Sequence, residues 1–521
     1  MQRLTVSLVI ILAGGLACGV QSNQNPIGPP STPPATTTTH PPNGQAAITV
    51  DFQNRVSREF AVPSDLIGAG NGYFGSQEAQ ALATLNESGL GLVRVELDLE
   101  SVYSNTQPDW TAIDQSLSAV QSAHMHAIVI IIGTPSWLAP NPNPCQTGGH
   151  DWAHAVPTDL RTWGGLAASF VGHVNQSFPG VVKYYEIWNE PDLVGFLCSL
   201  PVSSLNTRMQ VYAQMYVAAG QAMKAQAAAD GVQILVGGPA TSNGWVTAAV
   251  LPTFVSNPGV ARYLDFVSYH YYPAPKGYSS WDQTNSGLLA MSLDGDHGFA
   301  AFYEAIALQT AKGVQPNAAS TPVMITEYND APQYGTNCCR NSATYSPLFN
   351  SIAVSELLNS VYAGAARVPA TLSYYRAKDW NSFCLLATPD TNCIWSSGPL
   401  APFPQLYAFE LISSPQYLGL SSGSFLVPTK MALPDPLRGS AFYGANSGAL
   451  LLINPSSSTY NGTVIMFSNA AINGPTATMF LLNASNPTVN KSSLSLSSDA
   501  QQNLHATVDI PPYSVIGIRI Q

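Results

Sequence analysis

Charged side chains are scarce in this sequence. Asp, Glu, Lys and Arg make up 9% of its 521 residues, against roughly 25% in an average soluble protein. Positive charge is the scarcer sign, with 19 Lys and Arg against 30 Asp and Glu. Because the chain has no basic field to attract a phosphate backbone, we expect no nucleic acid partner.

Metal-binding and redox motifs are also missing. The seven cysteines form no C-x-x-C pair and no Cys/His cluster at zinc spacing, so we expect no metal, no cofactor and no redox chemistry. Once Cys18 is set apart, an even number of cysteines is left, which in an exported protein indicates disulfides. These are Cys145, Cys198, Cys338, Cys339, Cys384 and Cys393.

The N-terminus has the order of an export signal. Arg3 supplies a positive charge, an apolar run from Leu4 to Ala13 follows, and Gly15-Leu16-Ala17 offers a small-residue cleavage site. The apolar run is too short to cross a bilayer as a helix. The segment resembles a bacterial lipobox with Gly15 in place of the usual Leu, which predicts lipidation of Cys18. We expect a periplasmic, outer-membrane or cell-surface lipoprotein; the alternative is an ordinary secretory signal and a secreted protein.

Composition divides the rest of the chain. Residues 23–44 are dominated by Pro and Thr and cannot bury a core, so an extended spacer is expected there. After about Tyr417, alternating strands separated by Gly, Asn, Ser and Pro replace the helical periodicity, which is typical of an antiparallel β-sandwich. The predicted parts are a signal peptide (1–17), a lipidation site and linker (18–45), a strand joining the sandwich (46–60), a catalytic barrel (61–413) and the sandwich (414–521).

Eight short apolar runs alternate with helical segments in the predicted barrel. Runs such as AIVIIIG (127–133) look buried on both faces, as the strands of a parallel barrel are. Eight such units predict an α/β fold, the (β/α)8 TIM barrel. A doubly wound sheet is disfavoured because G-A-G-N-G lacks the spacing of a phosphate-binding turn. The expected strands are 65–70, 92–97, 127–133, 184–188, 234–237, 266–269, 323–326 and 371–375, and the expected helices are 77–87, 112–124, 160–174, 205–228, 299–311 and 348–363.

Two carboxylates stand where such a barrel places its chemistry. YYEIWNEPD (184–192) closes the fourth strand and VMITEYND (323–330) closes the seventh, and catalytic residues of TIM barrels lie at the C-terminal strand ends. We therefore expect Glu190 and Glu327 to face each other. Two carboxyl groups roughly 5–5.5 Å apart allow one to attack an anomeric carbon while the other protonates the leaving oxygen.

The motif W-N-E-P on strand four, with a Glu on strand seven, resembles clan A of the glycoside hydrolases, which are retaining TIM-barrel enzymes. The wider pattern is similar to family 39, the β-xylosidase and α-L-iduronidase family. The resemblance implies a retaining glycosidase with a carbohydrate substrate, and a β-xylosidase-like activity is the first expectation. The resemblance to family 39 rests on the segments LVRVEL (92–97), GTPSWL (133–138), DFVSYHYYP (265–273), ITEY (325–328) and PPYSVIGI (511–518).

The resemblance also implies roles for single residues. Glu190 would be the acid/base and Glu327 the nucleophile, and Asn189 would contact the hydroxyl next to the anomeric carbon. Strict alternation would turn Asn189 and Glu190 to opposite faces of the strand. We therefore expect the strand to bend or bulge near Pro191, so that both side chains reach the sugar.

Three further residues are expected to support these groups. Arg94 resembles the clan's arginine that supports the nucleophile electrostatically. It is also the natural partner of Glu186, which shares a strand face with the acid/base and needs a partner once buried. His270 and Tyr272 match the family's H-x-Y, and we expect them to hydrogen-bond Glu327 and the substrate.

Aromatic platforms for a sugar ring are expected at the mouth of the barrel. Trp137 follows the third strand, and one of Trp380 or Trp395 would complete the platform. The eighth strand, TLSYYRAKDW, departs from the clan because no Trp follows it immediately.

The six cysteines all follow barrel strands, on the face expected to hold the site. Because strands three and four are neighbours in a barrel, we predict a Cys145–Cys198 bond. The other four follow strands seven and eight and are expected to pair among themselves. Such bonds would hold the long loops around the substrate in shape.

Other functions share parts of this pattern. Within the clan, a β-glucuronidase-like or endo-glucanase or endo-xylanase activity uses the same barrel and carboxylates. A lipid-anchored carbohydrate-binding protein without catalysis would have been expected to lose a carboxylate, and both are present. A metal-dependent hydrolase would need more His and Asp ligands at the strand ends than this sequence supplies.

Overall fold

The computed structural model describes residues 47–55, 60–61, 66–70, 77–149, 151–198, 204–272, 321–329, 344–362, 372–374, 386–387, 400–419, 425–444, 447–470, 472 and 474–521, with a few positions between 289 and 306. They belong to one unit of the chain, Ala46–Gln521. Several predictions fall outside these residues, namely those for the signal segment, the spacer, Cys18, Cys338, Cys339, Cys384, Cys393, Trp380 and Trp395.

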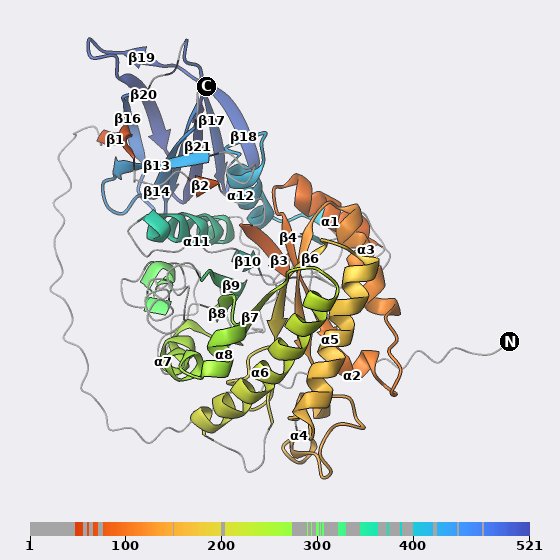
Figure 1. The fold of residues 1–521 in the computed structure, drawn as a ribbon. Helices are drawn as coiled ribbons and strands as arrows, with labels where there is room; N and C mark the ends of the chain where they lie inside the picture. The colour runs from red at the N-terminus through yellow and green to blue at the C-terminus, as the bar shows by residue number, and fades with distance from the viewer. Residues whose placement is uncertain are drawn as a thin grey trace, which may run out of the picture. The chain divides into compact units, whose positions relative to one another are not determined.

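Eight parallel strands close a barrel in the order β10-β3-β4-β5-β6-β7-β8-β9 (Figure 1). The predicted TIM barrel is therefore confirmed, and every expected strand is present. Their bounds are β3 (Ile67–Gly70), β4 (Leu92–Asp98), β5 (His126–Ile132), β6 (Val182–Ile187), β7 (Leu235–Thr241), β8 (Phe266–Tyr271), β9 (Val323–Tyr328) and β10 (Leu372–Tyr374).

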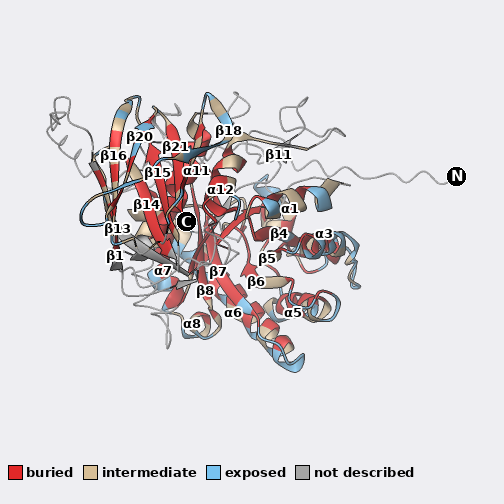
Figure 2. Cartoon of the chain, turned by 90° about the horizontal axis from the view of Figure 1, so that it is seen from above, coloured by how far each residue is buried: buried red, intermediate tan, exposed pale blue. Residues whose placement is uncertain are grey.

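The long helices on the outside of the barrel, such as α5 and α6, bury residues that recur at helical spacing. At the start of α5, the Asp159 side chain caps the helix by accepting from the N–H groups of Arg161 and Thr162. Figure 2 shows exposed residues on the outward sides of α3, α5 and α6. No helix in the described part of the chain is long and apolar enough for a membrane span. The helices are α1 (Glu78–Glu87), α2 (Leu99–Val102), α3 (Thr111–Ser122), α4 (Pro144–Thr147), α5 (Leu160–Ser177), α6 (Leu205–Ala229), α7 (Gly244–Val255), α8 (Pro258–Tyr263), α11 (Tyr345–Tyr362) and α12 (Pro404–Ser413), with the short 3-10 helix η2 (Trp152–His154).

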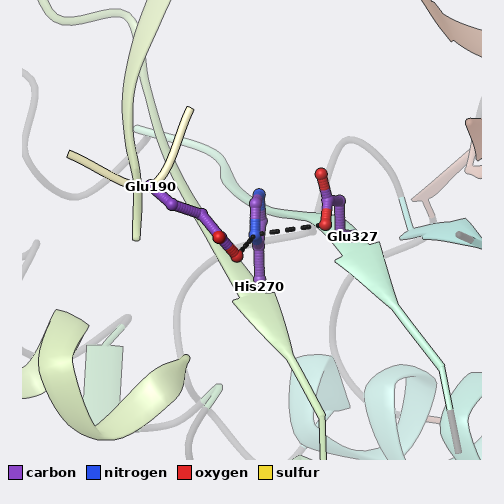
Figure 3. A group of neighbouring side chains, drawn as sticks. All are labelled: Glu190, His270 and Glu327. Carbon is purple, nitrogen blue, oxygen red and sulfur yellow. Dashed lines mark hydrogen bonds and ion pairs between the residues drawn. The ribbon is translucent and has the colours of Figure 1, made fainter. Parts of the chain in front are cut away.

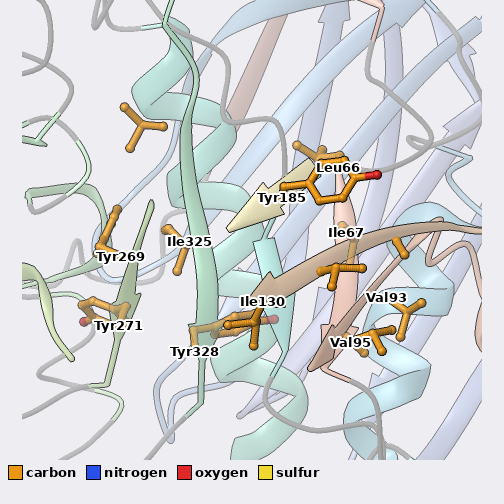
Figure 4. Close-up of a cluster of buried hydrophobic side chains, with 14 of the residues drawn as sticks. Leu66, Ile67, Val93, Val95, Ile130, Tyr185, Tyr269, Tyr271, Ile325 and Tyr328 are labelled. Carbon is orange, nitrogen blue, oxygen red and sulfur yellow. The ribbon is translucent and has the colours of Figure 1, made fainter. Parts of the chain in front are cut away.

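The two faces of the barrel strands pack into separate cores. Outward side chains such as Val93, Val95 and Tyr185 join the large core under the helices (Figure 4). Inward side chains form a small apolar cluster that closes the barrel floor and positions the polar groups above it. This floor consists of Leu92, Ile128, Tyr184, Phe266 and Met324.

The C-terminal strands form a connected ladder that folds into two layers. The ladder runs β18-β17-β21-β15-β14-β13-β1-β16-β20-β19, with β2 beside β13. Strands far apart in this order, such as β15 and β20, share one apolar core, so the ladder closes over it as a sandwich. The strands are β1 (Ala47–Arg55), β2 (Phe60–Ala61), β13 (Phe425–Ala432), β14 (Arg438–Gly444), β15 (Ser447–Asn454), β16 (Tyr460–Ser468), β17 (Ala477–Asn483), β18 (Asn486–Leu494), β19 (Ser497–Ser498), β20 (Leu504–Ile510) and β21 (Ser514–Ile520), and a separate pair is β11 (Leu386–Ala387) with β12 (Ala401–Pro402).

One pairing in the sandwich differs from the antiparallel expectation. The strand β1 lies between β13 and β16, antiparallel to the first and parallel to the second. The parallel pair is possible because β1 enters from the other end of the sequence and needs no hairpin to β16.

Hydrogen bonds join the barrel helix α11 to the sandwich strand β14. The Ser355 and Ser440 hydroxyls are 2.8 Å apart, and Asn359 Nδ2 donates to Gly439 O at 3.1 Å.

Candidate active site

The chain leaves the strand geometry directly after β6. Trp188 and Glu190 both have left-handed backbones, with φ of 68° and 45°, which is uncommon for residues with a side chain. Hydrogen bonds hold this bend: Trp188 N donates to Ile131 O and Glu190 N donates to Ala240 O, both at 2.9 Å. The bend expected near Pro191 is therefore present, and it lets Asn189 and Glu190 reach the same side.

A second irregularity brings Glu327 into the barrel. Tyr269 pairs with Ile325, but His270 pairs with Glu327, so β9 has one extra residue, Thr326, between the two pairs. Since the side chains of a strand alternate, strict pairing would put Glu327 on the outward face with Ile325. The β-bulge at Thr326 turns the carboxylate inward, beside His270.

His270 lies between the two candidate catalytic carboxylates (Figure 3). Its Nδ1 is 2.8 Å from Glu190 Oε1 and 3.4 Å from Glu327 Oε2. One ligand atom from each of these three side chains lies within 4.8 Å of the others. That spacing is close to the roughly 5–5.5 Å of retaining glycosidases and well below the 6.5–9.5 Å of inverting ones. The expected contact of His270 with Glu327 is present, and the His270 side chain is fully enclosed, which disfavours a direct contact with the substrate.

Arg94 supports this group from inside the barrel. Its Nε and Nη2 donate to Glu186 Oε2 at 2.8 and 2.6 Å, and its Nη1 donates to Glu327 Oε1. The same Nη2 donates to Asn189 Oδ1 at 2.8 Å. The expected pairing of Arg94 with Glu186 is thus present, and Arg94 is only 5% exposed. Arg94 therefore acts on Glu327 and Asn189, and it does not line the surface that meets solvent. From the other side, Tyr272 Oη donates to Glu327 Oε2 at 2.8 Å.

The surroundings move the two carboxyl pKa values in opposite directions. Burial raises the pKa of Glu190 more than its interaction with His270 lowers it. Burial would also raise the pKa of Glu327, but the charges of His270 and Arg94, together with hydrogen bonds from Tyr272 and Arg94, lower it. For His270, burial lowers the pKa, but the charges of Glu327 and Glu190 outweigh burial and raise it. Glu190 is thus set to hold a proton and Glu327 to lose one.

Asp192 belongs to this arrangement but was not singled out from the sequence. It is only 4% exposed, and its carboxylate accepts from Ser242 N at 3.0 Å and Ser242 Oγ at 2.6 Å. Its charge also raises the pKa of Glu190. By tying the loop after β6 to the end of β7, Asp192 holds the bend that carries Glu190. The sequence feature that could have indicated Asp192 is its place directly after the WNEP motif, where it is the last residue of WNEPD.

The predicted Cys145–Cys198 disulfide is present and joins the loops after β5 and β6. Backbone bonds reinforce it: Cys198 N donates to His154 O at 3.1 Å and Val156 N donates to Cys198 O at 3.2 Å. Trp137, also after β5, is 41% exposed, and its Nε1 donates to Tyr103 O at 3.0 Å. Its ring is therefore held in one orientation while much of it faces solvent, as a sugar platform requires.

Glu190, His270 and Glu327 also form the only cluster in the described residues that offers three close His, Cys, Asp or Glu ligands to a metal ion. The guanidinium of Arg94 bonds directly to Glu327. A fixed positive charge there repels a divalent cation, so the arrangement favours acid–base and nucleophilic chemistry over metal binding.

Comparison with known proteins agrees with this geometry. A sequence model of the family described as Glycosyl hydrolases family 39 matches residues 86–368, more than half of the 521-residue chain. No curated protein sequence matches the chain.

Solved structures with the same fold cover almost the whole chain. The GH39 enzyme from Xanthomonas axonopodis pv. citri is 15% identical with a TM-score of 0.62, covering 94% of this chain and 99% of its own. A monomeric beta-xylosidase from Caulobacter crescentus CB15 is 15% identical with a TM-score of 0.60, covering 91% and 99%. A bacterial orthologue of human α-L-iduronidase is 15% identical with a TM-score of 0.63, covering 91% and 83%. At these identities the likeness establishes the fold.

Proposed function

The chain belongs to the glycosyl hydrolases of family 39, and from this premise we propose that it is a retaining β-glycosidase with a β-xylosidase-like preference. The observation that carries the proposal is the position of Glu190 and Glu327, with an oxygen of each within 4.8 Å of the other. The opposite shifts of their pKa values provide one protonated and one ionised carboxyl group.

In the first step, Glu327 attacks the anomeric carbon and Glu190 gives its proton to the leaving glycosidic oxygen. The C–O bond to the leaving group breaks as the C–O bond to Glu327 forms. Arg94 and Tyr272 hold the attacking carboxylate in place. Because Asn189 Oδ1 is engaged by Arg94, its amide N–H2 group faces the sugar hydroxyl next to the reacting carbon.

In the second step, Glu190, now ionised, takes a proton from water as that water attacks the glycosyl–Glu327 bond. The pKa of Glu190 falls between the steps because Glu327 loses its negative charge on forming the ester. His270 Nδ1 faces both carboxylates through the two steps, 2.8 Å from Glu190 Oε1 and 3.4 Å from Glu327 Oε2. Two displacements at one carbon return the original configuration.

The stereochemistry of the first product tests this mechanism. Proton NMR of aryl β-xyloside hydrolysis should show the β-anomer first. We expect Glu327→Ala to lose about 10⁴-fold or more in kcat, whereas Glu87→Ala, at an exposed carboxylate of α1, should keep full activity. For Glu190→Ala, added azide should yield the β-glycosyl azide from a dinitrophenyl glycoside. An α-configured first product, or an active Glu327→Ala enzyme, would overturn the role assignment.

The substrate preference is tested separately from the mechanism. The β-xylosidase-like preference is proposed from the Caulobacter beta-xylosidase, which has the same fold over 99% of its own chain. A panel of aryl β-xylosides, glucosides, galactosides and glucuronides beside polysaccharides separates this preference from the β-glucuronidase-like and endo-acting alternatives.

We also propose export and lipid anchoring at Cys18, on the sequence signal alone. Intact mass of the membrane fraction should show a diacylglycerol adduct on a chain that begins at Cys18. A soluble chain beginning there without an adduct would leave export but remove the anchor.

A further inference from the structure

Glu96 differs from its neighbours on β4. Of the seven residues of this strand, all within the described part of the chain, Glu96 alone is exposed. By alternation it shares a face with Leu92, which lies in the barrel floor, and with Arg94, which bonds to Glu327. Exposure along this face therefore rises from Leu92 through Arg94 to Glu96.

The exposure of Glu96 can only be through the mouth of the barrel. The opposite face of β4 is covered, since Val93, Val95 and Leu97 are 0%, 3% and 1% exposed. Neither edge of the strand is open, because β4 pairs with β3 on one side and with β5 on the other. The Glu96 side chain therefore lies on the inward face of the barrel, nearer its mouth than Arg94.

The distance along the strand places Glu96 within reach of a bound sugar. Two residues of a β-strand span roughly 6.5 Å, so Glu96 lies about the width of one sugar ring beyond Arg94. A pyranose whose anomeric carbon touches Glu327 would bring its other ring hydroxyls toward this position.

The two described cations of the site are already engaged by carboxylates. Arg94 is shared between Glu186 and Glu327, and His270 between Glu327 and Glu190. Glu96 adds a further carboxylate at the entrance. An ionised carboxylate only accepts hydrogen bonds, and its bonds from hydroxyl groups are strong. It repels a second carboxylate at short range, most of all in a site that excludes water.

We propose that Glu96 is a specificity-determining residue that accepts hydrogen bonds from hydroxyl groups of a neutral sugar and repels a sugar that carries a carboxylate. The inference rests on the proposed glycosidase function and narrows its substrate class to neutral glycosides, against uronides.

The test compares kcat/KM for 4-nitrophenyl β-xyloside and 4-nitrophenyl β-glucuronide in wild type, Glu96→Gln and the control Glu87→Gln. We expect the wild type to prefer the xyloside by about 100-fold or more. Glu96→Gln keeps the size of the side chain. It should lower kcat/KM for the xyloside about tenfold or more and reduce the ratio of kcat/KM for the xyloside to that for the glucuronide. The control should match the wild type in both values.

A second measurement needs no variant. D-Xylose should inhibit the wild type at concentrations where D-glucuronate does not. Equal inhibition by the two sugars, or an unchanged xyloside-to-glucuronide ratio in a folded Glu96→Gln enzyme, would overturn the role of Glu96. If the wild type hydrolyses no glycoside, or Glu327→Ala stays active, the proposed function fails instead.

Discussion

His270 stands beside Glu327 across β8 and β9 because β9 carries one extra residue between their pairing and the preceding pair. This register also puts His270 Nδ1 within 2.8 Å of Glu190 on the loop after β6. One bulge and one bend, on strands far apart in sequence, therefore build the carboxylate pair.

Arg94 is expected to matter both for stability and for the ionisation of Glu327. Replacing it by Met leaves Glu186 buried without its partner, which should cost roughly 3–5 kcal/mol of the free energy of unfolding. It also removes a charge that lowers the pKa of Glu327, so the acidic limb of kcat/KM against pH should move to higher pH. Thermal unfolding and pH–rate profiles measure the two effects.

Arg94→Lys is the matched control for that variant. Lys keeps the positive charge but cannot bond to Glu186, Glu327 and Asn189 at once. We expect a smaller movement of the acidic limb than in Arg94→Met, with kcat/KM still reduced about 100-fold. An acidic limb that stays in place in both variants would contradict the electrostatic role.

Asp192 is predicted to act as a positioning residue for Glu190. Its negative charge contributes to the raised pKa of Glu190, so Asp192→Asn should move the alkaline limb of the pH–rate profile to lower pH. We expect kcat to fall about tenfold as well, because the amide can no longer accept both bonds from Ser242. Ser242→Ala keeps the charge, and its alkaline limb should remain that of the wild type.

Glu190 is expected to lower the stability of the fold at neutral and alkaline pH. Its pKa in the folded chain is raised above its ordinary value of 4.5, so the fold favours the protonated form. The stability that this form contributes is complete below pH 4.5 and is lost as pH rises through the folded-state pKa. Glu190→Gln cannot ionise and should be more stable than the wild type at pH 8, by roughly 1 kcal/mol.

The check on this prediction is thermal unfolding of wild type and Glu190→Gln across the pH range. The two melting temperatures should converge near pH 4, where the wild-type carboxyl is protonated. A constant difference at all pH values would mean that the substitution acts through packing and not through ionisation.

The Cys145–Cys198 bond is predicted to stabilise the loops around the site. It closes a sequence separation of 53 residues, for which the chain-entropy relation gives about 4 kcal/mol. The double variant Cys145→Ser/Cys198→Ser should therefore melt several degrees lower. Reductant should lower the wild-type melting temperature more than that of the double variant, and an equal response of the two proteins would argue against this role.

Much of the molecule follows from local patterns in the sequence. Apolar runs alternating with helical segments predicted the barrel, because strands buried on both faces need continuous apolar side chains. The order of neighbouring strands predicted the Cys145–Cys198 bond. Strict alternation would turn Asn189 and Glu190 to opposite faces of the strand, whereas the motif needs both at the sugar. This conflict predicted a bend after β6, but it did not predict which residues would have left-handed backbones.

Other features depended on contacts between distant segments. The bulge at Thr326 turns Glu327 inward, and no local pattern marks it, because register is set by pairing with β8. The bonds from Ser242 to Asp192 join two loops that are 50 residues apart. The exposure of Glu96 required closure of the barrel, which covers one face and both edges of β4 and leaves only the mouth open. Sequence periodicity specifies which face a residue occupies on a regular strand, and only the assembled sheet decides where that regularity breaks.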